Sequence, residues 1–333
     1  MADLKLDIAF WDYDRTRALA NGNVKVPGVS PTFHSAPIVT EIFDGMVGER
    51  KFHVSELGMT YFLRTFKGQA SPFIAIPVFP NRAFRHSAIY VNKASGIERP
   101  EDLNGKTIGE LALYSHDAGI IPKGMLMDEY GFKPETCRWI IGGLDWPMKP
   151  IDFVPDTHPA NVQVSNIPNG KELGAMLEAG EIEALISADN PKCILENSPK
   201  VGRLFPDYPA VERAYYKRTG IFPIMHTVVI RRDLLEQSPW LAKAIYESFC
   251  DAKEAAVNDY KHNLIFNNMG IMFPWFSQLI NDDRAVLGDD WWPYGIGANR
   301  KAIDAILRYH FEQGVTDRLF KIDDIFVPEL LTT

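Results

Sequence analysis

The chain has 333 residues, of which 46% are hydrophobic, and a formal net charge of -8 at pH 7. This length suggests about two domains with large cores, and the acidic balance argues against a nucleic-acid-binding protein, which usually carries a basic patch. The three cysteines (Cys137, Cys193 and Cys250) form no Cys-x-x-Cys pair, so neither a disulfide framework nor a zinc knuckle is predicted.

The ends and apolar runs of the chain bear on its compartment. The first residues contain no basic segment followed by a long apolar segment, so they do not resemble a secretory signal. The sequence also lacks a run of about 18 apolar residues, the length needed to cross a bilayer. We therefore expect a cytoplasmic protein.

In the first part of the chain, apolar runs alternate with turn residues and helical patterns. Strands are expected over residues 6–11, 53–57, 73–79, 87–91 and 106–110. Helices are expected over residues 38–52 and 59–66, and a polar loop over residues 12–17. The next helix should begin at Ser115 or Asp117, either of which suits an N-cap, and end at Tyr130.

The remaining chain continues this alternation and then becomes helical. Strands are expected over residues 138–141 and 183–187, helices over 171–179 and 211–217, and a surface excursion over 145–169. After Pro239, apolar residues recur at spacings of three and four, which is typical of an amphipathic helix. A further helix is expected over residues 298–311, preceded by an aromatic loop at 289–295. The pattern predicts an α/β fold.

Between two apolar runs, residues 78–92 contain Arg82, Arg85 and His86 within five positions. Burying these groups without an anionic partner is costly, and loops at strand ends are where an α/β sheet binds its ligand. The stretch therefore predicts an anion-binding hinge. The alternative is that the arginines pair with ordinary surface carboxylates.

Segments spread over nearly the whole chain match one known family in the same order. They are Trp11-Asp12-Tyr13-Asp14-Arg15-Thr16-Arg17, Val54-Ser55-Glu56, Ile76 to Pro80, Arg85 to Asn92, Asp128 to Gly131, Gly142 to Leu144, Leu204 to Tyr208, Arg218 to His226 and Trp292 to Gly295. These segments resemble the 4,5-dihydroxyphthalate decarboxylase family.

The resemblance implies a two-lobed α/β fold of the type II periplasmic-binding-protein kind, with a ligand cleft between the lobes. Residues 1–91 and 228–333 would form one lobe, and residues 92–227 the other. One helix departs from the family, which usually carries a Trp and an Arg before its Gly. Here the sequence is Ile120-Ile121-Pro122-Lys123-Gly124. Because Lys lacks the planar fork of Arg, the substitution pattern of the substrate ring does not carry over.

The activity implied is the cofactor-independent removal of one carboxylate from a dihydroxylated aromatic dicarboxylate. The substrate would be 4,5-dihydroxyphthalate, giving protocatechuate and CO2, or a close analogue. A hydroxyl para to the carboxylate can supply electrons once a base removes its proton, and an acid then protonates the ring carbon. The alternative is a non-catalytic binding protein for an aromatic carboxylate.

The candidate catalytic residues are His86, His116, His226 and Glu56. Imidazole suits proton transfer near neutral pH, and His86 and His226 fall at the two expected crossovers between lobes. Three of these residues have a structural alternative. His226 interrupts an apolar run, as a core histidine would. His116, together with Asp117, could simply cap a helix, and Glu56 could form an ordinary ion pair.

Further side chains are candidates for holding the substrate. They are Tyr13, Arg15, Arg82, Arg85, Asp117, Lys123, Asp189 and Tyr294. The arginines suit carboxylate recognition, since a hydrogen bond to a charged group is worth roughly 1.5–3 kcal/mol. Tyr294 could stack on the ring, with a packed aromatic corner as the alternative.

No cofactor is expected. A divalent metal bound among Glu56, His86, His116, Asp117 and His226 is the alternative, although no short ligand spacing such as His-Glu-x-x-His occurs. The expected partner is a small aromatic carboxylate substrate, with no nucleic acid and no membrane. A homo-oligomer is left open.

Overall fold

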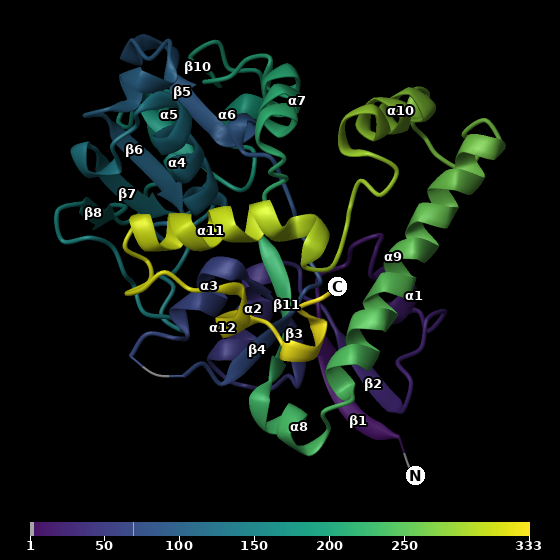
Figure 1. Ribbon diagram of the computed structural model, residues 1–333. Coiled ribbons are helices and arrows are strands. Elements are labelled where there is room, and N and C mark those ends of the chain that lie inside the picture. The colour runs from purple at the N-terminus through teal and green to yellow at the C-terminus, as the bar shows by residue number, and fades with distance from the viewer. Residues whose placement is uncertain (1–2, 69) are drawn as a thin grey trace.

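The computed structural model describes residues 3–68 and 70–333, which fold around two separate β-sheets (Figure 1). The first sheet has the strand order β2-β1-β3-β11-β4, and the second has the order β10-β5-β9-β6-β7-β8. Helices pack against both sheets (Figure 1). The expected α/β class with two lobes is confirmed.

The strands of the first sheet come from both ends of the chain. They are β1 (Leu4–Ala9), β2 (Val29–His34), β3 (Val54–Gly58), β4 (Phe73–Ile76) and β11 (His226–Arg231). β1 pairs in parallel with β2 and β3, whereas β11 runs antiparallel between β3 and β4. The helices of this lobe are α1 (Arg17–Ala20), α2 (Val39–Val47), α3 (Met59–Arg64), α8 (Arg232–Gln237), α9 (Leu241–Ile265), α11 (Arg300–Glu312) and α12 (Ile322–Ile325).

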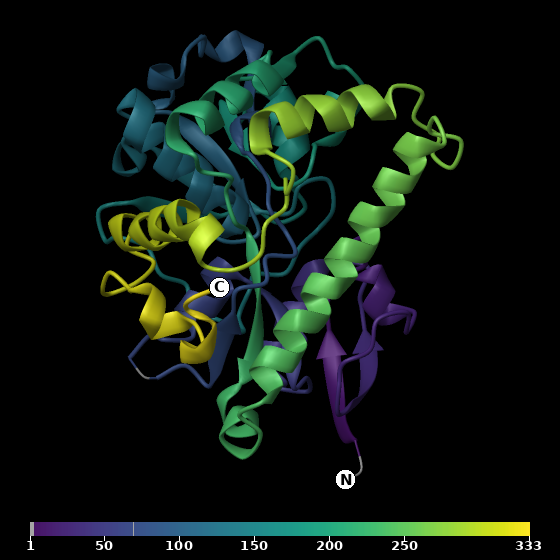
Figure 2. The same cartoon turned by 45° about the vertical axis from the view of Figure 1, so that its right-hand side comes forward.

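The second lobe is built from one continuous part of the chain. Its strands are β5 (Ile89–Asn92), β6 (Thr107–Leu111), β7 (Arg138–Gly142), β8 (Gln163–Asn166), β9 (Ala184–Ile186) and β10 (Val201–Arg203). Its helices are α4 (Asp117–Tyr130), α5 (Leu173–Ala179), α6 (Lys192–Leu195) and α7 (Tyr208–Thr219). A further helix, α10 (Phe276–Leu287), turns back from the end of α9 toward α7 (Figure 2).

The chain crosses between the sheets after β4 and again before β11. The expected boundary at residues 91 and 92 cuts β5, which belongs entirely to the second sheet. The expected boundary at residues 227 and 228 likewise cuts β11, which belongs entirely to the first. Each crossing therefore lies a few residues earlier than expected, because a strand joins a sheet as one hydrogen-bonded unit.

Sequence patterns missed three edge strands, β2, β8 and β10, and misplaced one cap. β2 contains Pro31, which is tolerated because β2 lies at the edge of its sheet. β8 lies within the stretch expected to be a surface excursion, and it too is an edge strand. His116 is the N-cap of α4, whereas the Ser115 hydroxyl donates to Oε1 of Gln313 over 3.1 Å.

Helix α4 is shared by the cores of both lobes. Ile120 and Ile121, near its start, pack into the core of the first lobe, whereas Met125 and Leu126 pack into that of the second. Helix α11 lies against it so closely that a Cβ on Gly124 would be 2.3 Å from the Tyr309 ring. No helix among the described residues has the length and apolar character needed to span a bilayer.

Candidate active site

The pairing of β3 with β11 brings a carboxylate and an imidazole together. His226 lies opposite Gly58, and Glu56 lies opposite Val228, so the side chains of Glu56 and His226 are diagonal neighbours on one face. Nδ1 of His226 lies 2.6 Å from Oε1 of Glu56, and both side chains are buried. An ionised Glu56 keeps the proton on Nδ1 and leaves Nε2 as the acceptor.

The loop after β1 holds Glu56 in place. The Tyr13 hydroxyl donates to Oε1 of Glu56 over 2.6 Å, and the Trp11 backbone N–H donates to Oε2 over 2.8 Å. Burial, reinforced by the Glu56 charge, raises the pKa of Tyr13 far above its usual value. Tyr13 therefore stays a hydrogen-bond donor, and Glu56 is fixed on both of its oxygens.

A second carboxylate enters from the other lobe at the start of α4. Oδ1 of Asp117 accepts a hydrogen bond of 2.7 Å from the Thr60 backbone N–H, which belongs to the first lobe. Its Oδ2 lies over Gly58, the cross-strand neighbour of His226. Burial raises the pKa of Asp117, although the charges of His226 and His116 act to lower it. The carboxyl is thereby inclined to hold a proton.

His116 is supported from behind by a buried ion pair. Its Nδ1 lies 3.3 Å from Oε1 of Glu110, and its buried Nε2 has no partner among the described residues. Lys123 donates to Oε2 of Glu110 over 2.7 Å, and its ammonium lies 3.7 Å from the centre of the Tyr114 ring. Burial opposes ionisation of Glu110, but Lys123 and His116 hold its pKa below the usual value.

Lys123, which the sequence predicts to bind substrate, is engaged by other groups of the protein. Its side chain is fully buried and its charge is taken up by Glu110. Burial lowers the pKa of Lys123 to about 8, against the attraction of Glu110. Lys123, at which the chain departs from the family pattern, therefore contacts Glu110 together with His116 and helps to hold the His116 ring.

Arg85 lies between the two crossovers. Its Nε donates to Sδ of Met225 over 3.2 Å and its Nη1 to the Ala188 carbonyl over 3.4 Å. Within the described ranges, no carboxylate comes within ion-pair distance of this buried guanidinium. Burial lowers the pKa of Arg85 to about 10, which Asp117 and Asp189 partly oppose. Pairing with a surface carboxylate, the alternative to an anion site, does not occur here.

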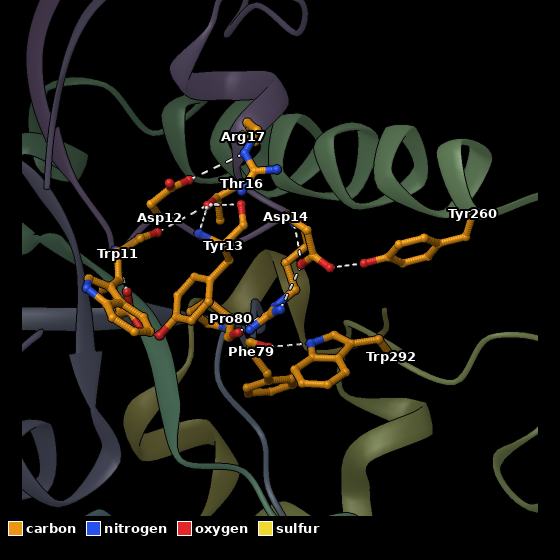
Figure 3. A network of polar contacts seen from close by, with 12 residues as sticks. Trp11, Asp12, Tyr13, Asp14, Thr16, Arg17, Phe79, Pro80, Tyr260 and Trp292 are labelled. Atoms are coloured by element: carbon orange, nitrogen blue, oxygen red, sulfur yellow. Dashed lines mark hydrogen bonds and ion pairs between the residues drawn. The ribbon is translucent and has the colours of Figure 1, made fainter. Parts of the chain in front are cut away.

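Arg15 and Arg82 are more fully engaged by the protein. Nε of Arg15 donates to the Pro80 carbonyl over 2.6 Å, and its guanidinium lies 4.2 Å and 4.3 Å from the ring centres of Tyr13 and Trp292. Figure 3 shows the Trp11–Arg17 loop beside Pro80 and Trp292. Arg82 donates to the carbonyls of Phe222 and Pro293, over 2.7 Å and 3.2 Å. The Arg82 guanidinium therefore links the chain segments that contain Phe222 and Pro293.

Two predicted substrate contacts lie in different settings. Tyr294 is buried, and its hydroxyl has no hydrogen-bond partner among the described residues. Burial raises the pKa of Tyr294, which the Arg15 charge opposes and the Glu56 charge reinforces. Asp189 is exposed, and its backbone N–H donates to the Ser187 hydroxyl over 3.1 Å.

His86, also predicted to be catalytic, lies in a different setting among aromatic side chains of the second lobe. Its ring packs edge-on against Phe205 and Tyr215, with ring centres 5.2 Å away in each case. Both ring nitrogens are buried and lack partners in the described part of the chain. Burial, helped by the Arg218 charge, lowers the pKa of His86 to about 4. Low pH is therefore needed to charge this ring, which packs among core aromatic residues of the second lobe.

Other features of the structure bear on cofactors and cavities. Among residues 3–68 and 70–333, no group of three or more His, Cys, Asp or Glu side chains is arranged to hold a metal ion. A cavity of about 310 Å³, lined by Leu63, Phe66, His158 and Thr316, contains none of the residues discussed above. The cluster of Glu56, His226 and Asp117 instead joins side chains of both lobes.

No family model matches the chain, but whole-chain comparison gives a clear result. The chain is 34% identical over 332 residues to a 4,5-dihydroxyphthalate decarboxylase of Comamonas testosteroni, covering 99% of this chain and 98% of that protein. The chain belongs to the 4,5-dihydroxyphthalate decarboxylase family. A Pseudomonas putida protein of the same name is 35% identical over 218 residues, covering 65% of this chain and 83% of its own.

Solved structures similar to this family member show its fold. A putative periplasmic sulfonate-binding protein SsuA of Methylobacillus flagellatus matches with a TM-score of 0.60 and 14% identity, over 100% of this chain and 94% of its own. The aliphatic sulphonate-binding protein SsuA of Escherichia coli matches with a TM-score of 0.56 and 12% identity, over 98% and 92%. The decarboxylase-family chain therefore has the two-lobed fold of periplasmic binding proteins.

Sequence reasoning missed three contributors to this site. Gly58 makes room for Asp117, Thr60 binds it, and Glu110 holds His116. Glu110 carried a weak signal, since it is a carboxylate at the end of a predicted strand, directly after Ile108 and Gly109. Gly58 lies two residues after the family-like segment Val54-Ser55-Glu56, but a glycine does not reveal which atom fills its space.

Proposed function

We propose that the chain is a carboxy-lyase that removes one carboxylate from a dihydroxylated aromatic dicarboxylate. The substrate is 4,5-dihydroxyphthalate, and the products are protocatechuate and CO2. The observation that carries the proposal is Arg85, a buried guanidinium with no carboxylate partner in the described chain, which donates to Met225, the chain neighbour of His226, and lies within the electrostatic influence of Asp117. A buried charge of this kind is costly until an anion binds it, and family membership supports an aromatic diacid as that anion.

His226 is the proposed base. Glu56 fixes the proton on Nδ1, so Nε2 accepts the proton of the ring hydroxyl para to the carboxylate that leaves. The resulting phenolate pushes electron density onto the ring carbon that bears this carboxylate. Because the phenolate supplies the electrons, the reaction needs no cofactor.

Asp117 is the proposed acid. Its raised pKa favours the protonated carboxyl, which donates a proton to the carboxylate-bearing ring carbon. The carbon–carbon bond then breaks, CO2 leaves without the bonding pair, and that pair restores the aromatic phenolate. His226 returns its proton to the phenolate oxygen, and a proton from solvent, passed on by His116, restores Asp117. The net change is one proton in place of CO2.

Arg85 and His116 complete the proposed site. Arg85 binds the carboxylate that is kept, through a planar fork that suits two carboxylate oxygens. His116 lies next to Asp117 in the chain, and its charge acts on the pKa of Asp117. We assign it the role of returning a proton to Asp117 between turnovers.

The test uses three matched diacids: 4,5-dihydroxyphthalate, 4-hydroxyphthalate and phthalate. We expect CO2 release from 4,5-dihydroxyphthalate and none from phthalate, which cannot form a phenolate. Glu56→Gln and His226→Asn should each lower turnover by about 10²–10⁴. Binding of 4,5-dihydroxyphthalate without CO2 release would instead indicate a binding protein.

A chelation experiment tests independence from metals. We expect activity to survive exhaustive chelation, since the phenolate alone drives the reaction. Loss of activity on chelation, restored by adding back one divalent metal, would contradict this part of the proposal.

A further inference from the structure

The hairpin between α9 and α10 carries apolar side chains far from either core. Figures 1 and 2 show α9 leaving the first lobe as a single long helix, with α10 turning back from its far end. We call residues 265–279 the apolar tip. It lies outside the site described above and takes no part in the proposed reaction.

The apolar tip concentrates exposed hydrophobic surface. Seven of the fourteen exposed large hydrophobic side chains in the described part of the chain lie within it. Met272 is 99% exposed and Trp275 is 78% exposed. When exposed apolar side chains are concentrated in one segment of a protein surface, they often mark an interaction site.

Hydrogen bonds within the hairpin keep these side chains outside. Oδ1 of Asn263 accepts from the Gly270 backbone N–H over 3.1 Å, and the Ser277 hydroxyl donates to Oδ1 of Asn268 over 2.9 Å. The turn is therefore held by its own polar groups. The patch is a formed surface that needs a partner to cover it.

The charge pattern indicates what that partner is. No Asp, Glu, Lys or Arg occurs between Lys261 and Asp282, in a chain where such residues make up 23% of the total. In a two-fold interface a surface meets its own copy, so a charge close to the two-fold axis would face the same charge of that copy. A stretch free of charge avoids this repulsion, and Met, Phe and Trp are enriched in such contacts.

We propose that the apolar tip is an interface through which a second copy of this chain docks by the same surface. A membrane surface fits the charges less well, because anionic lipids attract clusters of Lys and Arg. Here the patch is followed directly by Asp282 and Asp283, and the net charge of the chain is -8.

Sedimentation velocity of the full chain at micromolar to tens of micromolar concentration tests the proposal. We expect the wild type to sediment as a dimer or a multiple of it, and a Met272→Glu, Trp275→Glu double variant to sediment as a monomer. Its melting temperature should match the wild type, since both side chains are exposed. The matched control is Leu195→Glu, which charges an exposed leucine of the second lobe and should leave association intact.

A cross-linking experiment gives a second readout that does not depend on how the charged variant folds. Met272→Cys should form a disulfide between two copies under mild oxidation, whereas Leu195→Cys should not. Cys137 and Cys193 are buried and should not contribute. A wild type that stays monomeric at tens of micromolar, or association that the double variant retains, would overturn the proposal. So would co-sedimentation of monomeric wild type with neutral phosphatidylcholine vesicles.

Discussion

Oδ2 of Asp117 occupies the space in which Gly58 would carry a side chain: a Cβ there would lie 1.9 Å from this oxygen. The backbone of Gly58, with φ -60° and ψ 139°, would accept alanine without strain. Gly58→Ala should therefore act by displacing Asp117 from its place beside His226. We expect turnover to fall at least 10-fold, and overpacking to cost about 1–3 kcal/mol of stability.

The control for this change is Gly202→Ala in β10. A Cβ at that position would meet only the flexible end of Lys93, at 3.3 Å. Steady-state kinetics and thermal melts of both variants decide the matter. Equal turnover in Gly58→Ala and Gly202→Ala would show that the contact of Asp117 with Gly58 is unimportant.

Asp117→Asn should separate activity from stability. The folded-state pKa of Asp117 lies above its unfolded value, so what it contributes to stability is fully present below the unfolded pKa and is lost as pH rises through the folded pKa. At neutral pH the asparagine avoids this cost, about 1.4 kcal/mol for each pKa unit of elevation, and its Oδ1 can still accept from Thr60. We expect a higher free energy of unfolding at pH 7 and turnover lowered by about 10²–10⁴. Reduced stability at pH 7 would contradict the raised pKa.

Arg85 and Arg82 provide a matched pair of buried arginines. Arg85→Ala should weaken binding of phthalate, used as an unreactive diacid, by about 10–150-fold, the equivalent of roughly 1.5–3 kcal/mol. Arg82→Lys loses the hydrogen bonds to the carbonyls of Phe222 and Pro293, so it should lower the melting temperature and change phthalate affinity little. Calorimetric titration and thermal melts distinguish the two. Similar affinity losses in both variants would argue against a special role for Arg85.

His86 should make the protein sensitive to mild acid. Its folded-state pKa of about 4 lies below the usual 6.5, so the unfolded chain binds more protons between these pH values. The free energy of unfolding should fall by up to about 3 kcal/mol as pH drops from 6.5 to 4. His86→Phe should remove this loss and leave turnover near the wild-type level, because neither ring nitrogen has a partner among the described residues.

Chemical denaturation at pH 7 and pH 5 measures this effect, with His262→Gln as the control because His262 is exposed. The buried His310, with a pKa lowered by burial to about 3, adds a similar sensitivity that remains in the variant. If the free energy of unfolding falls as much between pH 7 and pH 5 in His86→Phe as in the wild type, the lowered pKa of His86 is contradicted.

Several parts of this arrangement could be predicted from the sequence. The alternation of apolar runs gave the two-sheet α/β class, and His226 was notable as the polar residue in an apolar strand. Family-like segments pointed to Glu56 and Tyr13, which hydrogen bond to each other. Such features are local, because a strand's period places alternate residues on one face.

What sequence could not provide were contacts set by packing between distant segments. His86 and Arg85 are adjacent in the chain, yet one faces Phe205 and Tyr215 and the other Met225. Their neighbours lie more than a hundred residues away, so proximity in sequence does not reveal which groups each side chain contacts. The pairing of Lys123 with Glu110 could not be predicted for a related reason: the role of a buried charge depends on which group it contacts in the folded chain.

The sharing of helix α4 between two cores has a consequence for how substrate enters. Parting the lobes would strip Ile120 and Ile121 from one core while Met125 and Leu126 stay in the other. Wetting those side chains costs free energy, roughly 1.5–3 kcal/mol for each large one. The closed arrangement is thus self-supporting without a ligand, so opening is the uphill event. A carrier that must hand over its cargo would be hindered by this cost, whereas a catalyst would gain from keeping its proton-transfer groups away from bulk water.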